Sequence, residues 1–119
     1  MEKLGKSSVY DLEDRTLNFA KRVICYANNL PKILSNIEIG RQLVRAAGSV
    51  GANYIEANEA LGKKDFFMHV RISRKEAKES RYWICLSEPK EDNKKEKEVL
   101  AGEATELLKI FNAIAMKAF

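Results

Sequence analysis

The sequence predicts an all-α protein, an antiparallel up-down-up-down four-helix bundle that associates into an oligomer. Four segments repeat their apolar residues at helical spacing, and the short connections between them favour antiparallel neighbours. Only 6 Gly and 2 Pro interrupt the 119 residues, which disfavours a β fold with its many turns. With 45% apolar and 32% charged residues the chain can bury one core, so we expect a single domain over residues 1–119.

The first helix is expected over about 11–28, after a loose tail at 1–9. Acidic Asp11, Glu13 and Asp14 suit the positive end of its dipole. The residue before Pro31 resists helical geometry, so the helix ends there. The residues expected to face the core are Leu12, Thr16, Phe19, Ala20, Val23, Ile24 and Ala27.

The second helix is expected over about 36–60. Ser35 and Glu38 have the spacing of a capping box at its start, and Gly62 is a suitable stop. Its core stripe is expected to contain Ile39, Leu43, Ala46, Val50, Tyr54, Ala57 and Leu61.

The third and fourth helices are expected over about 64–87 and 94–118, with Pro89 between them. The third has a narrow core stripe of small and apolar residues, namely Phe66, Val70, Ser73, Ala77, Ser80 and Ile84. The fourth is expected to bury Leu100, Ala104, Leu107, Leu108, Phe111, Ile114, Ala115 and Ala118.

The positive charge of the chain is concentrated in the third helix. Residues 63–81 hold seven basic and three acidic residues, whereas the rest of the chain holds 14 of each. Such a stripe is either a solvated helix face or a binding surface for a polyanion. The candidate nucleic-acid-binding residues are Lys63, Lys64, Arg71, Arg74, Lys78 and Arg81.

Two helices carry apolar or small residues away from their core stripes, which predicts a protein interface. Gly48 and Gly51 lie inside the second helix, where each costs about 1 kcal/mol relative to Ala. Close approach of another helix would offset that cost, either in a second subunit or within one bundle. The candidate interface residues are Val44, Gly48, Gly51, Ala52, Ile55, Met68, Ile72, Trp83 and Leu86.

A polar ladder runs beside the core stripe of the second helix and consists of Gln42, Arg45, Ser49, Asn53 and Glu56. One interpretation is a structural seam, with Arg45 paired to a carboxylate such as Glu56, Glu76 or Glu79. The other is a polar site.

The sequence offers no set of catalytic residues, and we expect neither an enzyme nor a cofactor. His69 is the single histidine, and Cys25 and Cys85 lie 60 residues apart, so no metal site is expected. The two thiols are expected to be buried and inert. No segment has the length and hydrophobicity of a membrane span or the pattern of a signal peptide, which indicates a cytoplasmic protein.

A series of short motifs runs through residues 40–86 in fixed order and spacing. These motifs are Gln42-x-x-Arg45-Ala46, Ser49-Val50-Gly51-Ala52-Asn53, Glu56-Ala57, Lys64-Asp65-Phe66 and Lys75-Glu76-Ala77-x-Glu79-Ser80-x-Tyr82-Trp83. With them the chain resembles the four-helix-bundle family of proteins encoded in 23S rRNA intervening sequences, also called S23 ribosomal proteins. It is more distantly similar to the accessory variability determinant proteins of diversity-generating retroelements. A departure is Ala57-Asn58, where many relatives have Glu-Gly.

The resemblance implies a homopentamer with a basic surface and supplies no catalytic residues. The retroelement proteins bind a reverse transcriptase and nucleic acid. We therefore expect a non-enzymatic, self-associating scaffold that binds RNA or DNA without strong sequence specificity. The alternative is an assembly module that binds another protein and no nucleic acid.

Overall fold

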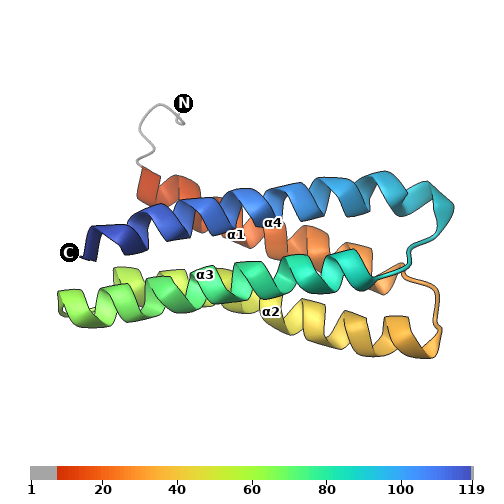
Figure 1. Cartoon of the computed structure of the whole chain (residues 1–119), viewed down its shortest axis with the longest axis horizontal. Helices are drawn as coiled ribbons and strands as arrows, with labels where there is room; N and C mark the ends of the chain where they lie inside the picture. The colour runs from red at the N-terminus through yellow and green to blue at the C-terminus, as the bar shows by residue number, and fades with distance from the viewer. Residues whose placement is uncertain (1–7, 119) are drawn as a thin grey trace.

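The computed structural model describes residues 8–118, which form four long helices and two short 3₁₀ turns and contain no strand. The helices are α1 (Ser8–Asn28), α2 (Leu34–Asn58), α3 (Lys63–Leu86) and α4 (Lys94–Ala115), and consecutive helices run in opposite directions (Figure 1). The turn η2 (Glu91–Asn93) leads into α4, and η3 (Met116–Ala118) follows it. The prediction of an all-α protein with four helices is confirmed. Most of the expected tail lies outside the described residues, but Ser8 and Val9 already belong to α1.

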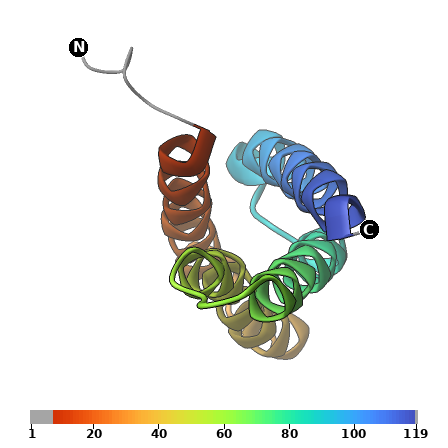
Figure 2. The ribbon, with the colours of Figure 1, turned by 90° about the vertical axis from the view of Figure 1, so that its left-hand side faces the viewer.

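The helices follow one another in an arc, so that α1 and α4 make the least extensive contact of any neighbouring pair (Figure 2). Two arginines of α1 reach across this side to carboxylates of α4. Arg15 donates to both oxygens of Glu103 at 2.7 and 2.9 Å, and Arg22 donates to both oxygens of Glu96 at 3.0 and 2.7 Å. Paired two-donor contacts of this kind fix the relative position of two helices better than single ones.

The core lies along the inner faces of the four helices, where the helical spacing predicts it. On α3, Val70, Ser73, Ala77, Ser80 and Ile84 are all buried, and on α4 the most buried side chains are Leu100, Ala104, Leu107, Phe111 and Ala115. Two expected core residues are instead exposed. Ile24 lies on the outer side of α1, and Leu61 lies in the connection after α2 has ended.

The prediction of a capping box at the start of α2 is wrong. The helix begins at Leu34, so Ser35 is already inside it, and Ile33 occupies the cap without a side-chain hydrogen bond. The first turn of α2 is held by Asn36, which is buried. Its amide donates to the carbonyl oxygens of Pro31 at 3.1 Å and Glu88 at 3.0 Å, and its oxygen accepts from the Glu88 backbone N–H at 3.0 Å. Asn36 therefore joins the α1–α2 connection to the α3–α4 connection.

Gly62 does not stop α2, which ends at Asn58; instead Gly62 is the residue that precedes α3. None of the four described helices is long and apolar enough to cross a membrane.

Candidate nucleic-acid interface

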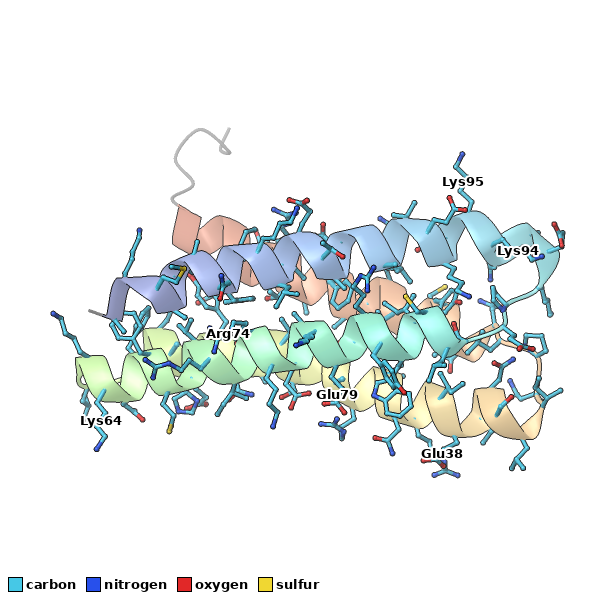
Figure 3. The ribbon with its side chains drawn as sticks, in the orientation of Figure 1. Glu38, Lys64, Arg74, Glu79, Lys94 and Lys95 are labelled. Atoms are coloured by element: carbon cyan, nitrogen blue, oxygen red, sulfur yellow. The ribbon has the colours of Figure 1, made fainter. Side chains whose placement is uncertain are left out.

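On α3, acidic Glu79 and basic Arg74 face different neighbouring helices. Figure 3 shows Glu79 on the side of α3 that faces α2 and Arg74 on the side that faces α4. The hydrogen bonds agree, because Glu79 accepts from Arg45 of α2 at 3.0 Å and Arg74 donates to Asn112 of α4 at 3.1 Å. Glu79 therefore points away from Arg74.

A groove of about 600 Å³ lies between α3 and α4 and is lined mainly by cations; we call it the basic groove. Its lining residues are Arg74, Lys75, Lys78, Leu108, Lys109 and Asn112. Lys109 lies 4.0 Å from Glu106, a weak contact between two exposed side chains. The groove thus gathers four basic side chains from two helices.

Two arginines that border α4 are held in place by hydrogen bonds from that helix. Arg74 Nη1 donates to Asn112 Oδ1 at 3.1 Å, and Arg81 Nε donates to Thr105 Oγ1 at 2.8 Å. Thr105 in turn donates to the Ala101 carbonyl at 3.0 Å. Each guanidinium has five N–H donors, so one bond to α4 leaves donors for an anion.

The other predicted basic residues lie along the same helix. Lys63, Lys64, Arg71 and Lys78 are exposed, and Lys63 and Lys64 form the first turn of α3. Sequence reasoning did not assign Lys75 or Lys109 to the candidate surface. Lys109 belongs to α4, and only the packing of α4 beside α3 brings it to the groove.

The carboxylates of α3 form a cluster with Arg45 and Trp83. The Arg45 guanidinium lies 3.5 Å from Glu76 Oε1 and 3.0 Å from Glu79 Oε2, and Trp83 Nε1 donates to Glu79 Oε2 at 3.3 Å. Only 7% of the Glu76 side chain is exposed, and its Oε1 atom has no hydrogen-bond partner.

The two carboxylates of this cluster differ in acidity. Burial raises the pKa of Glu76 against the attraction of Arg45. Burial also acts to raise the pKa of Glu79, but hydrogen bonds from Arg45 and Trp83 outweigh it and lower that pKa. Arg45 is therefore the main counter-charge to Glu76 and Glu79, and Lys75 adds a smaller attraction to Glu76.

The polar ladder of α2 lies against α3. Asn53 donates to the Ser49 carbonyl at 3.0 Å and hydroxyl at 2.9 Å, and its own oxygen lies 3.1 Å from His69 Nδ1. Gln42 donates to Glu38 along the same helix at 3.1 Å, and Glu56 is exposed. These contacts, together with the Arg45 pairs, are those of a structural seam.

Within residues 8–118 no group of three or more His, Cys, Asp or Glu is arranged to hold a metal ion. His69 has one carboxylate neighbour, Asp65, with 3.8 Å between Nε2 and Oδ1.

The candidate interface residues do not form one face. On α2, Val44, Ala52 and Ile55 are exposed, and a Cβ added to Gly48 would meet no atom within 4 Å, so these four positions lie open. On α3, Met68 and Leu86 are exposed, Ile72 is half-buried, and Trp83 packs against the core of the bundle. The expectation that Gly51 faces another subunit is wrong, because a Cβ there would lie 2.9 Å from Thr16 of α1.

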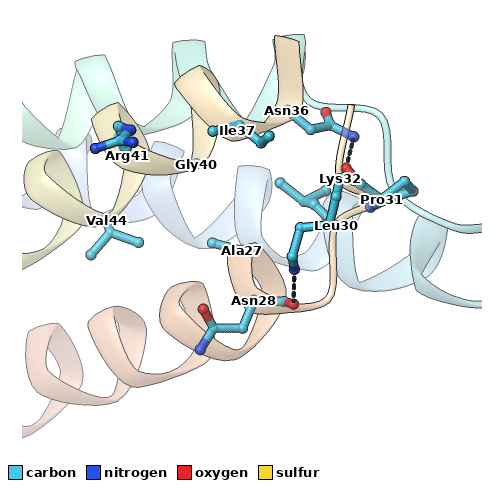
Figure 4. A pocket seen from close by; sticks show the side chains of 10 residues that line it. All are labelled: Ala27, Asn28, Leu30, Pro31, Lys32, Asn36, Ile37, Gly40, Arg41 and Val44. Atoms are coloured by element: carbon cyan, nitrogen blue, oxygen red, sulfur yellow. Dashed lines mark hydrogen bonds between the residues drawn. The ribbon is translucent and has the colours of Figure 1, made fainter. Parts of the chain in front are cut away.

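A second groove, of about 420 Å³, lies where α1 turns into α2 (Figure 4). Val44, Gly40 and Ile37 line its α2 side, and Ala27 and Asn28 line its α1 side. Ile37 is exposed and was not among the predicted interface residues. It extends the apolar surface of Val44 by two helical turns.

The prediction of buried thiols is also wrong, since Cys25 and Cys85 are both free and exposed. Each lies outside the core stripe of its helix, and the general preference of free cysteine for the interior misled the prediction.

Comparison with known proteins identifies the family. No curated protein sequence matches the chain. Its fold is similar to the crystal structure of a protein of unknown function from the S23 ribosomal protein family of Bacteroides thetaiotaomicron. The TM-score is 0.74 and the identity 27%, over 87% of this chain and 96% of that one. Residues 10–113 match the model of the 23S rRNA-intervening sequence proteins, so the expected resemblance is confirmed and the chain belongs to that family.

Proposed function

We propose that this protein is a non-enzymatic, self-associating helical scaffold in the cytoplasm, whose basic groove binds the phosphate backbone of RNA or DNA. The observation that carries this proposal is the sorting of charge on α3. Glu76 and Glu79 pair with Arg45, whereas Arg74, Lys75 and Lys78 meet Lys109 at the groove. Exposed cations can exchange their counterions for phosphates, which is the main source of sequence-independent affinity.

Self-association would make this weak surface effective. A few phosphate contacts per subunit bind loosely, but several grooves on one particle bind together and raise the overall affinity. The exposed apolar side chains of Ile37, Val44 and Ile55 support an interface between copies. The family resemblance implies five copies. The names of the family and of its structural relative refer to 23S rRNA and to a ribosomal protein. These names agree with nucleic acid as the partner.

The proposal is tested by fluorescence anisotropy with a labelled RNA and a labelled DNA across a salt series. The expected slope of log K against log salt is about −0.9 for each phosphate contacted on a duplex. The variant Arg74→Glu with Lys78→Glu should bind at least about tenfold more weakly, because it reverses two charges at the groove.

The matched control is Lys21→Glu with Lys95→Glu, which changes the net charge equally at two exposed positions that do not line the groove. If both double variants lose affinity equally, net charge alone explains the loss, and the basic groove is not the binding site. Light scattering on each variant checks that the size of the particle is unchanged.

A second function is favoured by the apolar surface of α2. In that case Ile37 and Val44 receive a different protein, and the cations of α3 pair with acidic groups of a neighbour. If this second function is correct, the protein self-associates but does not bind nucleic acid even at low salt.

A further inference from the structure

The lining of the basic groove provides contacts for phosphates and no aromatic ring on which a base could stack. Its six lining residues are four cations, one amide and one leucine, and none is aromatic. Proteins that hold single strands without sequence preference combine a cationic channel with aromatic side chains on which successive bases stack. The groove has the first of these features and lacks the second.

The aromatic side chains of α3 are engaged elsewhere. Tyr82 is exposed, but its ring meets Trp83 edge to face at 5.2 Å, and Trp83 is bonded to Glu79 on the α2 side of the helix. Phe67 meets Phe66 at 5.1 Å, also edge to face. Among the aromatic residues of α3, Tyr82 is therefore the one exposed ring, and it packs against Trp83.

The cations form a straight row on a rigid support. Arg74 and Arg81 lie seven residues apart, which is about 10 Å along a helix, and the row from Lys64 to Arg81 spans about 25 Å. Asn112 and Thr105 hold the two arginines. A straight, fixed row suits a partner that is itself stiff, because a flexible strand loses entropy when it is aligned. Duplexes are stiff over about 50 nm and carry one charge per about 1.7 Å of axis, counting both strands.

We infer that the partner of the basic groove is double-stranded nucleic acid, gripped along one phosphate strand, rather than a single strand. This inference rests on the proposed function and specifies its ligand. Duplex RNA and duplex DNA present the same chemistry to such a groove, and the experiment below separates them.

The test uses the full chain and four labelled probes of equal strand length at one salt concentration. The probes are an RNA duplex, a DNA duplex, oligo(U) and oligo(dT). We expect at least one duplex to bind about tenfold more tightly than either single strand. Comparing the two duplexes shows whether RNA or DNA is preferred.

The variant Tyr82→Ala keeps every cation and removes the exposed ring. Its affinity for the duplexes should stay within about twofold of the parent, and its melting temperature and particle size show whether it is intact. A single strand that binds as tightly as the duplexes, or a tenfold loss in Tyr82→Ala with the fold intact, would overturn the inference and leave the proposed function standing. Absence of binding to all four probes would overturn the proposed function and the inference with it.

Discussion

A Cβ atom on Gly51 of α2 would lie 2.9 Å from the hydroxyl oxygen of Thr16 on α1 and 3.2 Å from its Cβ. Thr16 is buried, and its hydroxyl donates to the Glu13 carbonyl at 3.1 Å, so it has little freedom to move aside. None of the described glycines has a positive φ. The glycine at position 51 is therefore explained by the narrow space between α1 and α2.

Gly51→Ala should destabilise the protein by about 1–3 kcal/mol through overpacking, despite the gain in helix propensity. Urea denaturation measures this loss. Gly102→Ala is the matched control, because a methyl group there meets nothing within 4 Å, and it should stabilise the fold by about 1 kcal/mol. Combining Gly51→Ala with Thr16→Ala should recover part of the loss. A Gly51→Ala protein more stable than the parent would contradict the close contact.

The helical pattern was sufficient to predict the four helices and most of their inner faces. On α3, inward positions two turns apart, such as Val70, Ala77 and Ile84, are buried as their spacing predicts. Periodicity works here because it reports the face that one helix turns to the core. It fails at helix ends. Leu61 continues the apolar spacing of α2, but it lies beyond the end of that helix and is exposed.

What the sequence could not supply are relationships between helices. The joining role of Asn36 depends on the Glu88 backbone, 52 residues away, which no local pattern reveals. The membership of Lys109 in the basic groove depends on how α4 is rotated against α3. The pairing of Arg45 was narrowed to Glu56, Glu76 or Glu79, and the structure selects the last two because they project from α3 toward α2.

Both thiols should react in the folded protein, because Cys25 and Cys85 are exposed. A chromogenic disulfide reagent added without denaturant should titrate both thiols of each chain at comparable rates. The same assay in denaturant gives the total and is the control. Protection of one thiol in the native protein would show that another copy or another part of the chain covers it.

Asn112→Ala should loosen Arg74 without changing any charge. The hydrogen bond from Arg74 Nη1 to Asn112 Oδ1, at 3.1 Å, holds the guanidinium at the groove. Without this bond the Arg74 side chain is free to move, and binding must then immobilise it at a cost of about 0.5–1.5 kcal/mol. We therefore expect a several-fold weaker affinity. The slope of affinity against salt should stay the same, since the number of cations is unchanged. A changed slope would indicate that Asn112 affects more than the position of Arg74.

The cluster of Arg45, Glu76 and Glu79 should make the stability of the protein depend on pH. Burial raises the pKa of Glu76 above its usual 4.5, so the folded protein holds this proton more tightly than the unfolded chain. Glu76 therefore reduces stability as the pH rises above that value. Glu79 behaves oppositely: its pKa is lowered against the effect of burial by Arg45 and Trp83, and its contribution is lost as the pH falls below 4.5.

Glu76→Gln removes the buried negative charge and should gain stability relative to the parent as the pH rises from about 4 to about 8. The difference should reach the order of 1 kcal/mol, the scale of a buried polar atom left without a partner. Glu79→Gln is the matched control and should show the reverse trend, with a deficit at neutral pH that closes as the pH falls. Urea denaturation of the three proteins across this range measures both trends. A Glu76→Gln difference that is constant with pH would mean that Glu76 titrates alike in the folded and unfolded chains, and that Arg45 fully offsets its burial.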